Sequence, residues 1–414
     1  MCVDRRHFIT FSALSALGFG LESKQLTARQ DSPVRKMADQ AKPITHDEHA
    51  ERQENARRYM REAGLSAVIL TGGSSLRYFT GAKWGISERL FAAVLPAKGE
   101  LGWIAPAFEK DRALEQIKFG RDLRTWEEDE SPHRLVASIL NDRGIRSGNI
   151  GIEETVQFRF SDAISRSAPA LQFMSADPVT ARCRRVKSAA EIELMRLANQ
   201  ITLKSYEMAV QSLKEGMTHL ELAARVAEAH RQLGVDQGGA LVLFAANAAL
   251  PHGTAAVQKL RQGDVVLIDG GCNVEGYHSD ITRTFVFGKP TDEQRRVWDI
   301  VKQAQAAALR EVRHDVPCEE VDAAARKVIE KAGFGPGYKY FTHRLGHGIG
   351  LDEHEWTYLV HGNKTKLEPG MVFSNEPGIY LPGRFGIRLE DIMVVTENGG
   401  YLLTGQATSI EQPF

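Results

Sequence analysis

Apolar and polar positions along the chain predict two regions that differ in secondary structure. Between residues 51 and 180, short apolar runs alternate with helical patterns, which is typical of a small α/β domain. Residues 188–234 carry apolar positions at helical spacing, and residues 241–396 are rich in predicted strands, with a helix pair between 292 and 332. We therefore expect an amino-terminal α/β domain at 51–180 and a larger mixed domain at 183–414, with its sheets inside and its helices outside.

The first fifty residues follow neither pattern. Arg5 and Arg6 precede an uncharged, largely apolar segment that is too short to span a bilayer, and together they resemble a twin-arginine export signal. A polar, charged stretch with two prolines follows and predicts a linker at 29–50. We expect a signal at 1–28 and export to a bacterial periplasm or cell envelope, with a cytoplasmic location if the signal does not function.

Two acids belong to a predicted hairpin in the larger domain. A buried strand ends at Asp269, a turn is predicted at 273–276, and a strand returns at 281–286. A turn centred within 273–276 places Asp269 directly opposite Asp280, and directly opposed residues point to the same face with Cβ atoms about 4.5–5.5 Å apart. The two carboxylates are therefore predicted to converge.

A second predicted hairpin repeats this arrangement. A strand at 371–376 and a returning strand at 386–395 flank a turn centred on Gly383, which places Glu376 opposite Glu390. Opposed like charges destabilise a sheet unless something neutralises them, and two divalent cations would balance four carboxylates. The sequence therefore predicts a site for two metal ions.

A histidine between the hairpins completes this set. His347 is flanked by Gly346 and Gly348, and a further glycine follows at 350, so the backbone can approach another group closely. An oxygen-rich set with one imidazole suits a hard or borderline ion, so we expect Mn²⁺, with Co²⁺, Fe²⁺ and Zn²⁺ as alternatives.

At these residues the chain resembles the pita-bread metallopeptidases, in particular aminopeptidase P and prolidase. The matching segments are 269–271, 279–284, 346–350, 375–380 and 386–391. The resemblance covers roughly residues 50–410. It implies an α/β (α+β) fold with a pita-bread catalytic domain of internal pseudo-two-fold symmetry, preceded by a smaller creatinase-type α/β domain.

The resemblance also implies a role for each site residue. Asp269 would hold one metal, Asp280 and Glu390 would bridge both, and His347 with Glu376 would complete the other. The nucleophile would be a hydroxide between the ions, with Glu376 as the proton shuttle.

Three further residues have implied roles around the metals. His252 and His354 correspond to positions that face the substrate. Arg388 lies two residues before Glu390 on the same face of the strand and is expected to pair with a carboxylate.

We therefore expect a Xaa-Pro peptidase of the aminopeptidase P type, with prolidase, a dipeptidase, as the alternative. Trp84 and Arg89 are candidates for closing the far side of its pocket. A metal-free creatinase-like hydrolase or a non-catalytic peptide-binding module is a more remote alternative, because each would be expected to have lost the acids. The expected partners are short proline-containing peptides and further copies of the chain in a homodimer or homotetramer. The 52 Lys and Arg against 53 Asp and Glu, a net charge of −1, argue against nucleic acid.

Overall fold

The computed structural model describes residues 36–414, which form one compact unit. The predicted signal at 1–28 and the beginning of the predicted linker lie outside the described residues. Among the described helices, none is both long enough and apolar enough to cross a membrane.

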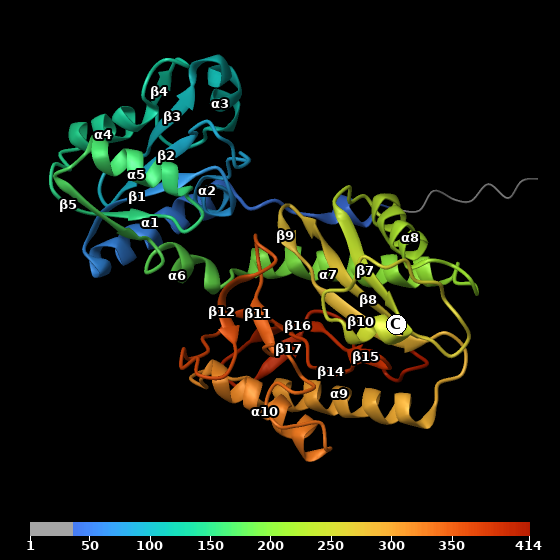
Figure 1. The fold of residues 1–414 in the computed structure, drawn as a ribbon. Helices are drawn as coiled ribbons and strands as arrows, with labels where there is room; N and C mark the ends of the chain where they lie inside the picture. The colour runs from blue at the N-terminus through green and yellow to red at the C-terminus, as the bar shows by residue number, and fades with distance from the viewer. Residues whose placement is uncertain (1–35) are drawn as a thin grey trace, which may run out of the picture. The chain divides into compact units, whose positions relative to one another are not determined.

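The amino-terminal domain is built on a six-stranded mixed sheet flanked by helices (Figure 1). The strand order is β4-β3-β2-β1-β5-β6; β5 runs parallel to β1 and β2 runs antiparallel to it. Its helices are α1 (His46–Ala63), α2 (Ser74–Thr80), α3 (Lys110–Gln116), α4 (Pro132–Asp142), α5 (Phe158–Ser167) and α6 (Thr180–Arg185). Its strands are β1 (Leu65–Thr71), β2 (Ala92–Pro96), β3 (Gly102–Pro106), β4 (Asp122–Trp126), β5 (Gly148–Ile152) and β6 (Leu171–Ser175).

Helix α1 begins within the segment 29–50 for which we expected a linker. Thr45 caps it by accepting a hydrogen bond from the backbone N–H of Glu48, which satisfies one of the free donors of the first turn. The helix ends at Gly64, whose φ of 68° lies in the left-handed region that glycine adopts without strain.

The larger domain repeats one unit, a helix pair followed by antiparallel strands. The first unit contains α7 (Ala189–Val210), α8 (His219–Gln232), β7 (Gly238–Phe244), β8 (Val265–Val274), β9 (Tyr277–His278) and β10 (Ile281–Val286). The second contains α9 (Asp292–Glu311), α10 (Cys318–Lys331), β11 (Gly346–Gly348), β12 (Glu355–Leu359), β13 (Val372–Asn375), β14 (Gly378–Leu381), β15 (Phe385–Arg388), β16 (Asp391–Val395) and β17 (Gly400–Leu402). The repeat confirms the predicted fold class and internal pseudo-symmetry.

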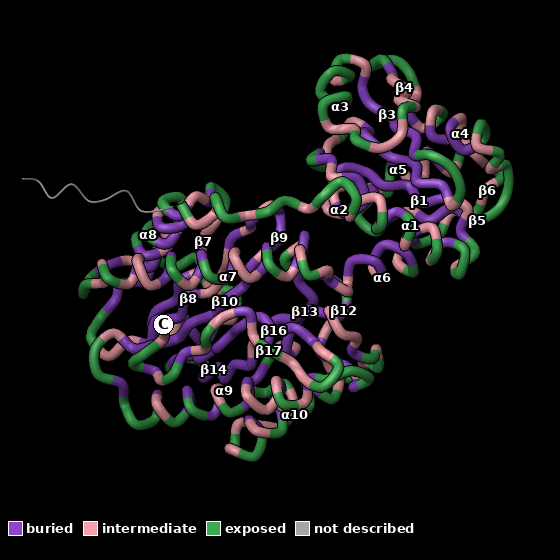
Figure 2. Tube along the Cα trace, turned by 180° about the vertical axis from the view of Figure 1, so that it is seen from behind, coloured by how far each residue is buried: buried purple, intermediate pink, exposed green. Residues whose placement is uncertain are grey.

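The sheets of the larger domain lie between its two helix pairs. One sheet has the strand order β10-β8-β7 and another has the order β12-β11-β13-β16-β17. Strands β14 and β15 form a separate two-stranded ribbon. Helices α7 and α8 cover one side and α9 and α10 the other (Figures 1 and 2). The strands are mostly buried, whereas the helices expose their outer faces (Figure 2).

Three of these four helices start with a capping box that is visible in the sequence. Ser188 before α7, Thr218 before α8 and Thr291 before α9 each accept from the backbone N–H three residues later, and the Glu or Gln at that position bonds back. Local sequence therefore fixes where the helices that support the sheets begin.

The first acid-bearing hairpin has a different register from the predicted one. Asp269 pairs with Thr282, so the prediction that it lies directly opposite Asp280 is wrong by two residues. The turn is Glu275 and Gly276 alone, with φ of 48° and 82°, as a two-residue hairpin loop requires. Because side chains alternate with a period of two, the shift keeps Asp280 on the same face as Thr282.

The second acid-bearing hairpin has the predicted register. Gly378 pairs with Arg388 across a turn centred on Gly383. Glu376 and Glu390 lie two residues further from this turn on either strand, where the ladder passes from β14 and β15 to β13 and β16. Because the ladder is broken here, the backbone groups of these acids can pair outside the hairpin. The N–H of Glu390 donates to the carbonyl of Thr282 in the other half of the domain.

Candidate metal centre

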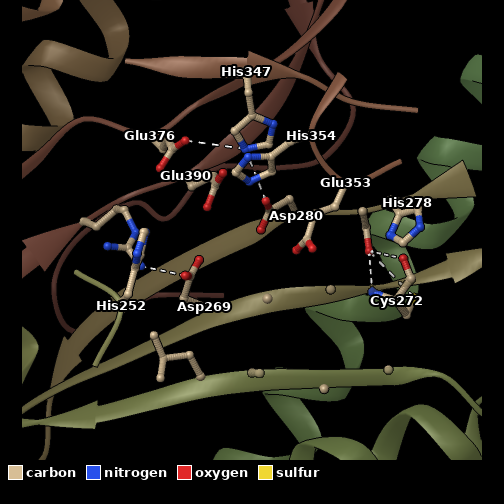
Figure 3. A pocket seen from close by; sticks show the side chains of 18 of the residues that line it. His252, Asp269, Cys272, His278, Asp280, His347, Glu353, His354, Glu376 and Glu390 are labelled. Atoms are coloured by element: carbon tan, nitrogen blue, oxygen red, sulfur yellow. Dashed lines mark hydrogen bonds and ion pairs between the residues drawn. The ribbon is translucent and has the colours of Figure 1, made fainter. Parts of the chain in front are cut away.

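The five predicted ligands converge in one cavity of the larger domain. The cavity has a volume of about 670 Å³. Asp269 lies on β8, Asp280 directly before β10 and His347 on β11. The break in the second hairpin brings Glu376 and Glu390 (Figure 3).

Ligand atoms of these residues fall into three overlapping groups, within each of which all atoms lie within 4.8 Å of one another. The groups are Asp269, Asp280 and Glu390; His347, Glu376 and Glu390; and Asp280, His347 and His354. Glu390 joins the first group to the second, and Asp280 joins the first to the third. This overlap is the arrangement that two neighbouring cations with shared ligands need.

The imidazole of His347 is held with its Nε2 toward the acids. Its Nδ1 lies 3.0 Å from the carbonyl oxygen of Gly348, so it donates there and leaves Nε2 free. Nε2 lies 3.5 Å from Oδ2 of Asp280 and 3.5 Å from Oε1 of Glu376.

Close backbone packing makes this orientation possible. A Cβ atom at Gly346 would lie 2.0 Å from the carbonyl oxygen of Ser374, and one at Gly271 would lie 1.8 Å from that of Ser279. Any side chain at either position would push apart strands that carry site residues.

Thr282 and Arg388 orient the acids on the other side of the cavity. The Thr282 hydroxyl lies 2.7 Å from Oε2 of Glu390 and also contacts Asp269. The Arg388 guanidinium donates to Asp269 over 2.6 Å and to the Tyr380 hydroxyl over 2.8 Å. Arg388 therefore pairs with a carboxylate, as its position in the strand predicts.

Burial sets the protonation of the acids in the protein without metal. It raises the pKa of Glu376 to about 7, and burial with the neighbouring acids raises that of Glu390. Burial likewise raises the pKa of Asp280. At Asp269, burial is outweighed by Arg388, which holds the pKa of that carboxyl below its usual value. Burial therefore makes ionisation of three of the four acids more costly until a cation compensates them.

The residues fit a pair of divalent ions. Oε1 of Glu390 is buried and has no hydrogen-bond partner, which is costly unless a cation occupies the site. Arg388 supplies one positive charge against four carboxylates, and the donors are oxygens with a single imidazole, the set preferred by hard or borderline ions.

The two histidines predicted to face the substrate line the same cavity in different ways. The His354 ring stacks on His347 with centroids 3.7 Å apart, and burial followed by the nearby His347 lowers the pKa of His354 to about 4. His354 is therefore neutral at pH 7. His252 lines the cavity but is exposed and belongs to none of the three ligand groups.

The sequence patterns assign no role to His343, Tyr380 or Thr282, yet the structure brings all three to the site. Nε2 of His343 lies 2.7 Å from the Tyr380 hydroxyl, and Nδ1 lies 3.8 Å from Oε2 of Glu376. Burial, with Arg388 second, lowers the pKa of His343 to about 3. No local pattern indicates this contact, because only the fold brings His343 to Tyr380.

Neither residue proposed to close the far side of the pocket does so within the chain. Trp84 is buried in the amino-terminal domain, where it stacks on Phe91 with centroids 3.9 Å apart. Arg89 pairs with Glu88 and Glu128 instead of lining the cavity.

Comparisons with known proteins agree with this architecture. The model of metallopeptidase family M24 matches residues 193–397, and that of the creatinase/prolidase N-terminal domain matches 52–186. An uncharacterised peptidase of Schizosaccharomyces pombe is 35% identical over 397 residues, 91% of this chain and 86% of that protein.

Solved structures show the same similarity over both domains. The prolidase of Thermococcus sibiricus is 34% identical with a TM-score of 0.79, over 86% of this chain and 97% of its own. The X-Pro aminopeptidase of Thermotoga maritima is 31% identical with a TM-score of 0.73, over 84% of this chain and 97% of its own.

Proposed function

Because the chain belongs to metallopeptidase family M24, we propose that it hydrolyses the bond between an amino-terminal residue and proline, with Xaa-Pro dipeptides as its best substrates. The observation that carries this proposal is the convergence of four acids and one histidine in one cavity of about 670 Å³. A metal-free hydrolase or a binding module would have no use for such a costly set of buried acids.

We assign the metal ligands as the resemblance implies, with Asp269 on one ion, Asp280 and Glu390 on both, and His347 and Glu376 on the other. Two bound divalent ions, of which Mn²⁺ is the expected kind, would polarise the scissile carbonyl and lower the pKa of a water molecule. The overlapping ligand groups support this assignment.

The remaining site residues would bind the substrate and handle protons. His354, neutral at pH 7, can donate a hydrogen bond to a carbonyl oxygen, and His252 lies where it can contact the peptide. Glu376, whose pKa is raised to about 7 by burial, can accept and return a proton. Arg388 keeps Asp269 ionised.

Substrate length distinguishes the two candidate peptidases. The prolidase relative is more similar to the chain than the X-Pro aminopeptidase is, which favours dipeptides. Arg344 also lines the cavity, and its guanidinium lies 4.1 Å from the centre of the Tyr358 ring. No carboxylate pairs with Arg344 among the described residues, so it can bind the free carboxylate of a dipeptide.

We therefore expect Ala-Pro to be hydrolysed with a kcat/KM about tenfold higher than that of Ala-Pro-Ala. An Arg344→Gln variant should lose most of this preference, and assays with Mn²⁺, Co²⁺ and Zn²⁺ would identify the activating ion. Equal or faster cleavage of the tripeptide by the wild type would instead support an enzyme of the aminopeptidase P type.

We also propose that the chain assembles into a homodimer or homotetramer, which light scattering would test.

We also propose that the protein is exported through its twin-arginine signal. The proposal rests on Arg5, Arg6 and the apolar segment after them, all outside the described residues. Replacing both arginines by lysine should leave the protein in the cytoplasm, as measured by cell fractionation, because the paired arginines are the recognised feature. Unchanged export of this variant would contradict the proposal.

A further inference from the structure

Glu353 is an acid of the same cavity that belongs to none of the ligand groups. It lies in the loop between β11 and β12, and its side chain points into the cavity beside Asp280 (Figure 3). The acids on either side of it in the loop are engaged elsewhere, since Asp352 pairs with Arg184 and Glu355 pairs with Arg184 and Lys187. Among the residues that the structure describes, no cation pairs with Glu353.

Charge balance leaves Glu353 as the acid that the metals do not compensate. Under the proposed function, on which this inference rests, two divalent ions neutralise the four acids of the cage. Glu353 lines the cavity while its neighbours Asp352 and Glu355 are already paired with cations, so a cation that a substrate brought into the cavity would be favoured beside its carboxylate. Of the cationic groups that a peptide can bring, the α-ammonium and a basic side chain are the two to consider.

Distance from the cage favours the side chain. The α-nitrogen of a peptide is two bonds from the scissile carbonyl carbon, so it must lie among the ligand atoms when that carbonyl is attacked. Glu353 has no oxygen in any group of atoms lying within 4.8 Å of one another. A cation at the end of the side chain of the peptide's first residue lies farther from the scissile carbonyl and would reach Glu353.

We propose that Glu353 is a specificity-determining residue that selects peptides whose first residue is lysine or arginine. Its carboxylate accepts a charge-assisted hydrogen bond from the side-chain ammonium or guanidinium while the peptide bond to proline lies over the cage. The effect depends on charge and reach, so an uncharged side chain of equal length gains nothing from it.

The test compares Lys-Pro with norleucine-Pro, whose first side chain has similar length and no charge. Both are assayed with the full, metal-loaded chain, with Glu353→Gln and with Asp352→Asn, a control that removes the adjacent acid outside the cavity. We expect the wild type and the control to prefer Lys-Pro about tenfold in kcat/KM, and Glu353→Gln to lose this preference through a lower kcat/KM on Lys-Pro. Glu353→Lys should in turn favour Glu-Pro, and the metal content of each variant should equal that of the wild type.

The ratio of the two substrates does not depend on how much of a variant is folded. A wild type without preference would overturn the inference and leave the proposed function standing, as would an equal loss on both substrates in Glu353→Gln. Loss of the preference in Asp352→Asn would also overturn it, because the charge of the loop and not Glu353 would then be responsible. Hydrolysis of neither dipeptide by metal-loaded wild type would overturn the inference and the proposed function together.

Discussion

Replacing Asp280 by asparagine should lower kcat on Xaa-Pro dipeptides on the order of 1000-fold, because this carboxylate belongs to two of the three ligand groups. Removal of a residue that only supports a metal ligand costs about 10–100-fold, and a shared ligand should cost more. Asparagine keeps the size of the side chain and removes its charge, so the effect would come from the metals. Activity with added Mn²⁺ and metal content after dialysis measure it.

Thermal unfolding separates a lost metal from a damaged fold. Divalent ions should raise the Tm of the wild type, since a ligand that binds only the folded state stabilises it, and should do so much less in Asp280→Asn. Asp299→Asn, an exposed acid on α9, is the matched control and should behave like the wild type. Full activity or an unchanged metal response in Asp280→Asn would refute the assignment of Asp280 as a shared ligand.

The sequence predicted the second hairpin better than the first for a physical reason. In the second, Gly383 adopts a φ of 75° at the centre of the turn, so the glycine marks the axis about which Glu376 and Glu390 are related. In the first, the turn needs two positive φ values and has only one glycine, Gly276, so its centre is not evident from residue types. The error did not move the acids to another face, because a shift of two residues preserves alternation.

Other features of the site could not be predicted because they depend on contacts between distant segments. The hydrogen bond of Tyr380 with His343 joins residues 37 positions apart, and neither has a local pattern that indicates it. Alternation along the strand did predict that Arg388 pairs with a carboxylate, but it did not predict that this carboxylate belongs to Asp269. Periodicity gives the face of a strand, and only the fold gives what lies opposite.

The sequence also did not indicate a buried charge cluster formed by Glu355, Arg184 and Lys187. Oε1 of Glu355 lies 2.5 Å from Nη2 of Arg184, and its Oε2 lies 2.9 Å from Nζ of Lys187. The exposed fraction of the side chain is 5% for Glu355, 5% for Arg184 and 1% for Lys187. A Cβ at Gly350 would lie 2.8 Å from both carboxylate oxygens, so the loop that carries His354 closes tightly over this acid.

Replacing Glu355 by glutamine should lower the free energy of unfolding at pH 7 by about 3–5 kcal/mol, because it leaves buried cations without their acid. Arg184 would keep Asp352, but no other acid pairs with Lys187 among the residues described. Urea unfolding measures the loss. Glu368→Gln is the matched control, since its pair with Arg185 is partly exposed and should be worth less than about 1 kcal/mol.

The dependence of this difference on pH gives a sharper test. Burial acts against ionisation of Glu355, but Arg184 and Lys187 outweigh it and lower the pKa of the carboxyl from 4.5 to about 2. The folded state therefore gains from this acid fully above pH 4.5, and the gain is lost as the pH falls from 4.5 toward 2. The difference in unfolding free energy between wild type and Glu355→Gln should shrink over that range, while other acids affect both proteins alike. A difference that stayed constant from pH 7 to well below 4.5 would show that Glu355 stabilises the protein by packing and not by its charge.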